Sequence, residues 1–228
     1  MTTGDAPMRT VIFDLDGTLA DTSADLLLAG NAAMEAMGHA PQLVLDRDAA
    51  TALHGGKAML RLSLERMGHD DLEAEIERGY PLLLEAYGNA LDVHTVLYPG
   101  VTEALEELLE EGFAIGICTN KPEALAERLM SALGVRGLFG SLIGADTLPT
   151  RKPDIAPYRA AVEGAGGVMA RSLLVGDTVT DRETARAAGV PSVLVSFGPL
   201  GMGVAELAPE ALLHRYAEMP GLARELLA

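Results

Sequence analysis

The chain of 228 residues contains a single cysteine, Cys118, so no disulfide can form within it. A lone cysteine fits the reducing environment of the cytoplasm, and we expect a cytoplasmic protein. Cys118 stands in an apolar run beside Ile117, with no histidine nearby in the sequence to activate a thiol. We therefore expect this thiol to be buried in a strand and not to act as a nucleophile.

Long apolar runs and positive charge are also scarce. No apolar segment of the sequence approaches the roughly 20 residues of a membrane-spanning helix, and residues 1–9 lack the pattern of a secretory signal. There are 17 Lys and Arg residues against 33 Asp and Glu residues, a net charge of −16, without a basic cluster to follow nucleic acid. We expect a soluble monomer or homodimer that binds neither membrane nor nucleic acid. Any site that binds an anion must obtain its positive charge locally, from a metal ion or a nearby lysine.

Hydrophobic periodicity divides the rest of the sequence into two regions. Residues 22–90 carry apolar residues at helical spacing and predict several short helices, two of them around Leu72–Ile76 and Leu83–Tyr87. From residue 98 onward, short apolar runs alternate with helical segments, which predicts a doubly wound parallel sheet. The apolar run at residues 11–13 must join that sheet because it is too apolar to stand alone.

The expected fold is therefore α/β, with a Rossmann-like core and a small helical cap domain. The core comprises residues 1–20 and 95–228, and the cap comprises residues 21–94, inserted after the first strand. The strands expected in the core are residues 11–13, 113–118, 142–144, 172–175, 192–196 and, at an edge, 211–213.

An acidic turn follows the first of these strands. Asp14 and Asp16 are separated by one residue, and Gly17 permits the chain to turn so that both can reach one small site. Carboxylates this close repel each other, and a cation or a shared proton relieves the repulsion. Because open α/β sheets bind ligands at the carboxyl ends of their strands, this turn predicts a site, although a surface Asp turn is the simpler alternative.

Polar residues mark three further positions at the same predicted edge. They are Thr119 and Asn120 after one strand, Lys152 in a loop, and Asp177 with Asp181 after another strand. Several carboxylates suit Mg²⁺, which can coordinate the protein and a substrate phosphate at once. The hydroxyl, amide and ammonium groups supply hydrogen-bond donors to an anion. The set predicts phosphoryl transfer, although Lys152 alone could be a solvated side chain and Thr119 a helix cap.

Four motifs of this chain, in order along the sequence, resemble those of the haloacid dehalogenase superfamily, in particular its phosphatase branch. They are Asp14-Leu15-Asp16-Gly17-Thr18, Thr119-Asn120, Lys152-Pro153 and Gly176-Asp177-Thr178-Val179-Thr180-Asp181. The helical insert is similar to the small cap of that family, and within the group the chain looks most like phosphoglycolate phosphatases. The resemblance implies a Mg²⁺-dependent phosphomonoester hydrolase that works through an aspartyl phosphate, with 2-phosphoglycolate the expected substrate.

The resemblance also assigns roles to the acids. Asp14 would attack phosphorus, and Asp16 would protonate the leaving oxygen and then activate water. The metal ligands would be Asp14, the main-chain carbonyl of Asp16, and Asp177, with Asp181 orienting the site or binding through water.

The remaining core residues would contact the phosphoryl group. Thr119 would donate to a phosphoryl oxygen, Lys152 would balance the charge of Asp14, and Asn120 would lie at the rim of the site.

Two sequence differences separate the branches of this superfamily. Dehalogenases lack the second acid of the first motif, whereas Asp16 is present here. The β-phosphoglucomutases carry a histidine shortly after that motif, and Ala24-Asp25-Leu26-Leu27 has none. The alternatives, in order, are a phosphatase for another small metabolite such as a sugar phosphate or nucleotide, a β-phosphoglucomutase-like phosphotransferase, and a non-catalytic binding protein.

Substrate choice is expected to reside in the cap. Leu53–Lys57 is the only cap stretch with both a flexible backbone and cationic character, and Gly55, Gly56 and Lys57 are predicted to bind the distal group of the substrate, a carboxylate in phosphoglycolate. An ordinary turn with an exposed lysine is the alternative. The remaining histidines have no ligand spacing and are expected at surface or loop positions; they are His39, His69, His94 and His214.

Overall fold

The computed structural model describes residues 8–228, so residues 1–7, including most of the segment expected not to be a secretory signal, lie outside the description. The chain forms two compact units. The sheet unit comprises the chain up to Leu19 together with Leu97–Ala228, and the helical unit comprises Ala20–Val96. None of the helices between residues 8 and 228 combines the length and hydropathy that crossing a bilayer requires.

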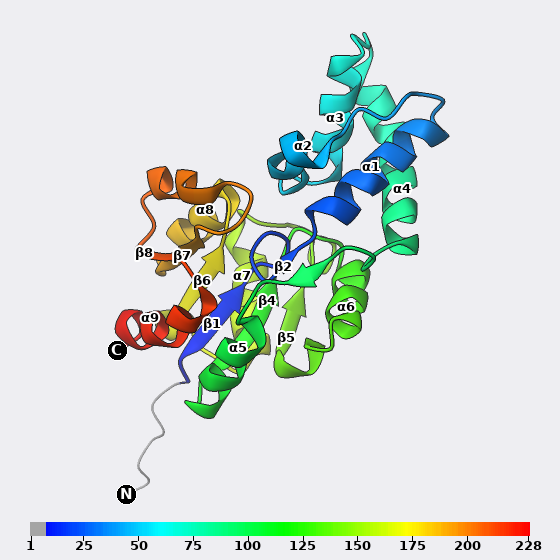
Figure 1. Ribbon diagram of the computed structural model, residues 1–228. Coiled ribbons are helices and arrows are strands. Elements are labelled where there is room, and N and C mark those ends of the chain that lie inside the picture. The colour runs from blue at the N-terminus through cyan, green and yellow to red at the C-terminus, as the bar shows by residue number, and fades with distance from the viewer. Residues whose placement is uncertain (1–7) are drawn as a thin grey trace, which may run out of the picture. The chain divides into compact units, whose positions relative to one another are not determined.

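Six parallel strands form the sheet unit, in the order β5-β4-β1-β6-β7-β8 (Figure 1). Their bounds are β1 Thr10–Phe13, β4 Ala114–Cys118, β5 Ser141–Ile143, β6 Ser172–Gly176, β7 Ser192–Val195 and β8 Ala211–Leu213. Val11, Ile12 and Phe13 are fully buried because β1 lies in the middle of the sheet, between β4 and β6. The expected α/β fold and parallel sheet are confirmed.

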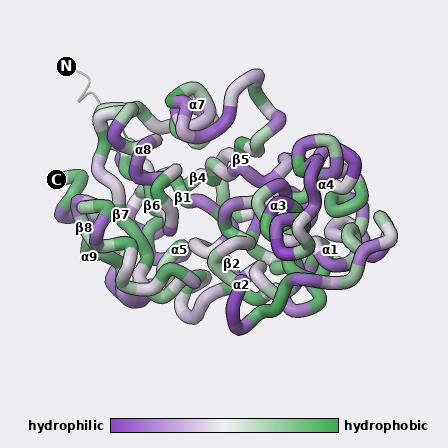
Figure 2. Tube along the Cα trace, turned by 90° about the horizontal axis from the view of Figure 1, so that it is seen from above, coloured by the Kyte–Doolittle hydropathy of each residue, from purple (hydrophilic) through white to green (hydrophobic). Residues whose placement is uncertain are grey.

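Helices cover both faces of this sheet. Figure 2 shows α7 and α8 on one side of the strands and α5 and α9 on the other. The helices of the unit are α5 Val101–Glu110, α6 Glu123–Ala132, α7 Ile155–Gly164, α8 Val179–Ala188 and α9 Met219–Leu226. Short 3₁₀ turns occupy Arg136–Leu138, Met169–Arg171, Gly201–Leu207 and Tyr216–Glu218. Cys118 is buried in β4, so the expected strand position of this cysteine is confirmed, and burial raises the pKa of its thiol to about 12.

Four helices form the helical unit: α1 Ser23–Ala36, α2 Leu45–Ala52, α3 Gly56–Arg66 and α4 Leu72–Asn89. The prediction of two helices around Leu72–Ile76 and Leu83–Tyr87 is wrong, because α4 runs unbroken through Pro81. Ile76, Leu83 and Tyr87 are all buried and lie on one helical face, so packing outweighs the lost backbone hydrogen bond.

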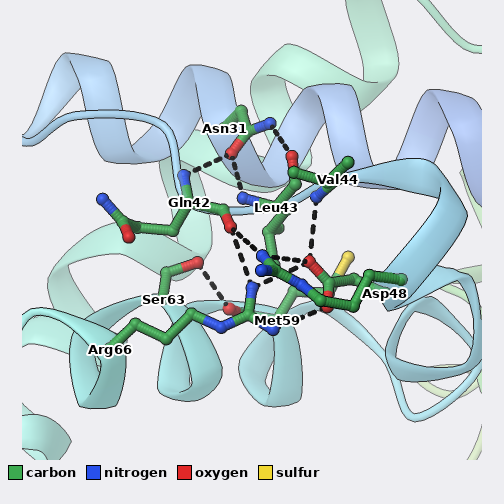
Figure 3. Close-up of polar contacts among 9 residues, drawn as sticks. Asn31, Gln42, Leu43, Val44, Asp48, Met59, Ser63 and Arg66 are labelled. Carbon is green, nitrogen blue, oxygen red and sulfur yellow. Dashed lines mark hydrogen bonds and ion pairs between the residues drawn. The ribbon is translucent and has the colours of Figure 1, made fainter.

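A polar network fastens the loop after α1 to α3 (Figure 3). The Asn31 side chain accepts from the main-chain N–H groups of Gln42 and Leu43, at 3.0 and 2.9 Å, and donates to the Leu43 carbonyl. Arg66, at the end of α3, donates to both carboxylate oxygens of Asp48, at 2.7 and 2.6 Å, and to the Gln42 carbonyl. Since Asp48 is almost fully buried, this paired charge determines where the loop lies.

The chain passes between the units through two short paired strands, β2 Ala20–Asp21 and β3 Val96–Leu97. Beside them, the Tyr98 amide donates to the Leu19 carbonyl at 3.1 Å. The departing and returning segments are thus held together.

Candidate active site

The first motif begins where β1 ends. The Asp14 amide donates to the Val175 carbonyl of β6 at 2.8 Å and so continues the pairing of the strands. The next amide, that of Leu15, donates to Asp14 Oδ1 at 2.7 Å, which fixes the carboxylate at the sheet edge. Gly17 has a φ of 77°, the left-handed conformation that lets the chain turn back after Asp16.

Lys152 connects the first and fourth motifs. Its Nζ lies 3.0 Å from Asp14 Oδ1 and 2.6 Å from Asp181 Oδ1, and its side chain is buried. Asn120 donates from Nδ2 to the Lys152 carbonyl at 3.1 Å and holds the loop that carries the lysine. The structure therefore brings these four sequence-predicted residues together, and Lys152 is not a solvated surface lysine.

The loop after β6 places the remaining two acids. Asp181 Oδ2 accepts hydrogen bonds from the Thr178 hydroxyl at 2.7 Å, the Thr178 amide at 3.1 Å and the Asp177 amide at 3.3 Å, a capping box at the start of α8. Gly176 permits this arrangement, because a Cβ there would lie 2.3 Å from Asp181 Cγ. Because Oδ1 of Asp181 binds Lys152, both carboxylate oxygens of Asp181 are engaged in contacts that hold the site together.

The donor set fits a hard divalent cation. One carboxylate oxygen from each of Asp14, Asp177 and Asp181 lies within 4.8 Å of the others. Asp177 Oδ1 accepts from the Thr18 hydroxyl at 3.2 Å, whereas the buried Asp177 Oδ2 has no hydrogen-bond partner. An orphaned carboxylate oxygen among other carboxylates is the ligand that Mg²⁺ prefers.

The electrostatics of the cluster favour the same cation. Burial raises the pKa of Asp14 to about 6; Lys152 opposes this shift, while Asp181 and Asp16 add to it. Burial, Asp181 and Asp14 likewise raise the pKa of Asp177 well above its usual value. Burial lowers the pKa of Lys152, but Asp14 and Asp181 outweigh it, so the pKa is raised and the ammonium stays charged. Carboxylates so placed resist ionising together, and a divalent cation offsets that cost.

Sequence reasoning missed Lys121. Its Nζ donates to Asp16 Oδ1 at 2.7 Å, and its amide donates to the Thr119 hydroxyl oxygen at 3.2 Å. Thr119 itself follows β4, where its amide donates to the Ile143 carbonyl at 2.9 Å, so it lies at the same sheet edge. Lys121 directly follows Thr119-Asn120, so the sequence could place it near the sheet edge but could not identify Asp16 as its partner.

The predicted distal-group residues lie in the helical unit, at the start of α3. Gly55 is the N-cap, with a φ of 88°, and a Cβ on Gly56 would lie 3.0 Å from Leu83 Cδ2 of α4, so both glycines have a structural reason to be there. Lys57 Nζ forms an exposed ion pair with Glu77 and lies 5.3 Å from the centre of the Tyr80 ring.

Comparison with known proteins agrees with this geometry. Residues 11–195 match the model of the family described as haloacid dehalogenase-like hydrolase. The chain belongs to that family. The phosphoglycolate phosphatase of Agrobacterium fabrum is 36% identical to it over 95% of this chain and 93% of that protein. The phosphoglycolate phosphatase of Cereibacter sphaeroides (strain ATCC 17029 / ATH 2.4.9) is also 36% identical, over 97% of this chain and all of that protein.

A solved structure shows how far the likeness extends. The crystal structure of a predicted phosphoglycolate phosphatase from Haemophilus somnus 129PT covers 96% of this chain, and this chain covers 99% of it. The TM-score is 0.83 at 25% sequence identity. The family resemblance expected from the four motifs is confirmed, and this haloacid dehalogenase-like hydrolase keeps both the sheet and the helical insert.

Proposed function

We propose that this hydrolase cleaves small phosphomonoesters with Mg²⁺ through a phosphorylated Asp14. The observation that carries the proposal is the convergence of three carboxylates within 4.8 Å of one another, two of them paired with the buried Lys152 ammonium and the third, Asp177, with an oxygen that makes no hydrogen bond. A merely structural ion cluster would satisfy that oxygen internally. An anionic substrate in a chain of net charge −16 requires positive charge at the site, and a divalent cation held by these carboxylates would supply it beside the Lys152 ammonium.

The carboxylates of Asp14 and Asp177 and the main-chain carbonyl of Asp16 would hold the metal. Bound there, Mg²⁺ would neutralise the phosphoryl oxygens that otherwise repel an attacking carboxylate. For Asp181 we propose an indirect role, because Lys152 and the Thr178 loop use both of its oxygens.

In the first half-reaction, a carboxylate oxygen of Asp14 attacks phosphorus, and the bond from phosphorus to the ester oxygen breaks. Asp16 gives its proton to the departing oxygen, which leaves as an alcohol. Lys152 and the Leu15 amide both bind Oδ1 of Asp14, so the nucleophile is oriented before the substrate arrives. Thr119 supplies a hydroxyl donor to a phosphoryl oxygen, and Asn120 keeps Lys152 in place from the rim.

In the second half-reaction, the ionised Asp16 takes a proton from water, and the water oxygen attacks phosphorus. The bond between phosphorus and Asp14 breaks, inorganic phosphate leaves, and both acids return to their starting states. Lys121 holds Asp16 at 2.7 Å, which fits a carboxyl group that must serve both half-reactions in one position.

For the substrate we propose 2-phosphoglycolate. Two relatives that align with nearly the whole chain bear the name phosphoglycolate phosphatase. The start of α3 offers the amide of Gly56 and the ammonium of Lys57, which suit the carboxylate of such a substrate. The Gly55 amide already donates to the Ala52 carbonyl at 3.0 Å, so Gly55 contributes the turn that presents them. The single buried thiol also fits the cytoplasm, where we place the reaction.

The deciding experiment is a turnover screen with and without Mg²⁺. The panel contains phosphoglycolate, glucose 1-phosphate, nucleoside monophosphates and an aryl phosphate. We expect Mg²⁺-dependent phosphate release with the highest kcat/KM for phosphoglycolate. Preference for a sugar phosphate or a nucleotide would reject the substrate but keep the chemistry, and transfer of phosphate between sugar positions would indicate a mutase. Absence of release from every ester, with Mg²⁺ present, would reject the enzyme function.

A further inference from the structure

A second cluster of side chains that could ligate a metal ion lies in the helical unit and shares no residue with the four motifs. His39, His69 and Glu75 each offer one ligand atom, and these atoms lie within 4.8 Å of one another. His39 Nε2 is 3.7 Å from Glu75 Oε2, and the two imidazole rings meet edge to face with their centres 5.7 Å apart. The histidines occupy loops, as the sequence predicted, but they converge.

Two nitrogen atoms of this cluster make no hydrogen bond, although one of them, His39 Nε2, lies 3.7 Å from Glu75 Oε2. His39 Nε2 and His69 Nδ1 are both buried atoms without a hydrogen bond. Buried polar atoms normally have hydrogen-bond partners. Two buried nitrogen atoms without one, beside a carboxylate, indicate a place for a hydrogen-bond donor or a cation. Because a neutral imidazole presents a lone pair on one nitrogen, a metal ion satisfies both rings and the carboxylate at once.

The helix ends explain why these side chains meet. The tripeptide Met-Gly-His occurs twice, at residues 37–39 and 67–69, and each copy ends a helix. Gly38 and Gly68 adopt positive φ, of 88° and 68°, and the amides of the two histidines return to the carbonyls of Met34 and Leu64. Each histidine therefore occupies the same place in a Schellman motif, at the ends of α1 and α3.

The local field favours a cation at this point. The carboxyl ends of two helices carry partial negative charge, and Glu75 adds a carboxylate from the first turn of α4. Arg78 donates from Nε to Oε2 of Glu75 at 3.2 Å and so orients that carboxylate. Ligating carboxylates in metal sites are commonly held by such an outer donor.

We infer that His39, His69 and Glu75 form a binding site for a zinc ion that fastens the ends of α1 and α3 to α4. Two imidazoles and one carboxylate are a zinc donor set, unlike the all-oxygen set of the sheet unit, and water completes a fourth position. Zinc bonds of about 2.0–2.1 Å place tetrahedral ligands roughly 3.3 Å apart. The 3.7 Å pair is already close to that separation, and side-chain rotation brings in the third ligand.

The polar network of Figure 3 prepares the site. Asn31 and Arg66 bind the main chain of Gln42, three residues after His39, and Arg66 itself lies three residues before His69. Both histidine-bearing loops are thereby held before any metal arrives, which lowers the entropic cost of binding.

Zinc titration of the chelator-stripped protein, with excess Mg²⁺ present to occupy the oxygen site, tests the inference. We expect one zinc ion per chain with micromolar or tighter affinity by calorimetry, and a higher melting temperature in zinc. His39→Gln and His69→Gln should each weaken binding by more than about 100-fold. The matched control is His214→Gln, which removes an exposed histidine of the sheet unit and should leave the affinity unchanged.

A measurement on the unaltered protein keeps the test independent of variant folding. Co²⁺ should give the visible absorption of a nitrogen-ligated, four-coordinate ion, and zinc should abolish it. Stoichiometric zinc binding that survives in folded His39→Gln and His69→Gln proteins would place the metal elsewhere and overturn the inference. Absence of both zinc binding and the Co²⁺ absorption in the parent protein would overturn it equally.

Discussion

Lys121 donates to Asp16 across a sequence separation of 105 residues, through a 2.7 Å contact between a buried ammonium and a carboxylate at the sheet edge. This lysine is a positioning residue for the acid that we assign to proton transfer. Lys121→Met should lower kcat by about tenfold or more with little change in KM, since proton transfer contributes about 10²–10⁴-fold. Steady-state kinetics measure this, and Lys121→Arg, which keeps a donor, should recover part of the loss.

A double variant separates positioning from general damage. In an Asp16→Asn background the same lysine change should cost nothing further, because the proton it positions is gone. Fully additive losses would contradict the assignment.

The nucleophile prediction concerns Asp14. Asp14→Asn should reduce kcat by more than about a thousandfold, because an amide cannot form the phosphoryl intermediate. Brief reaction with ³²P-labelled ester and acid quenching should label the parent protein and not this variant. The control is Asp154→Asn, which alters an aspartate that caps α7; turnover retained by Asp14→Asn in protein free of contaminating phosphatase would exclude the nucleophile role.

The Gly176→Ala variant tests whether close packing against Asp181 is needed to hold the site. A Cβ at this position would meet Asp181 Cγ at 2.3 Å, so Gly176→Ala must displace the partner of Lys152. We expect a stability loss of about 1–3 kcal/mol and a lower kcat. Gly137→Ala is the matched control, because a Cβ there meets nothing within 4 Å. Urea denaturation and kinetics on both variants measure the difference, and equal behaviour of the two would refute the argument.

Lys57 tests the proposed selectivity. Lys57→Ala should raise KM for phosphoglycolate by about tenfold while sparing an aryl phosphate, which lacks the distal carboxylate. Glu77→Gln should lower KM for phosphoglycolate, since Glu77 competes for the same ammonium. Arg61→Ala removes the neighbouring α3–α4 ion pair, that of Arg61 with Glu73, and serves as control. If KM is unmoved in the first two variants, residues 55–57 do not select the substrate.

Asp48 gives a prediction for stability against pH. The hydrogen bond from Arg66 lowers the pKa of this carboxyl group far below its usual value, against the opposing effect of burial. A lowered folded-state pKa stabilises the protein above the unfolded value of about 3.9, and the benefit is lost as the pH falls further. Asp48→Asn should therefore cost about 3 kcal/mol at neutral pH, and the gap to the parent protein should shrink below about pH 4.

Urea denaturation over a pH series measures that gap. Asp46→Asn, in the same turn of α2, is the control and should change stability by less than about 0.5 kcal/mol. If the difference in free energy of unfolding between the parent protein and Asp48→Asn stays constant below about pH 4, Asp48 stabilises the fold through packing and not through its charge.

The sequence predicts the parts of this molecule in which local pattern and fold rules agree. The strand before Asp14 is apolar because it is central, and parallel strands bring their carboxyl ends to one edge, so the motif residues could be placed there without coordinates. The contact between Lys121 and Asp16 was not predictable, because no rule states which of two adjacent side chains, Asn120 or Lys121, reaches a neighbouring strand.

The helical unit shows where such reasoning fails. The sequence predicts two helices where the structure has one, because tertiary packing keeps α4 continuous through Pro81. His39 and His69 show no ligand spacing, since their proximity depends on how α1 and α3 pack. The repeated Met-Gly-His tripeptide was visible, yet only the structure shows that the two helix ends are neighbours.

The hydrogen bond between Leu19 and Tyr98, together with the β2–β3 pair, makes the entire insert a long excursion whose two ends touch. Such an excursion can lengthen, shorten or be replaced without shifting the spacing of the strands that carry the four motifs. A foreign helical insert can therefore be grafted at the same two points without altering the strands to which the four motifs are attached.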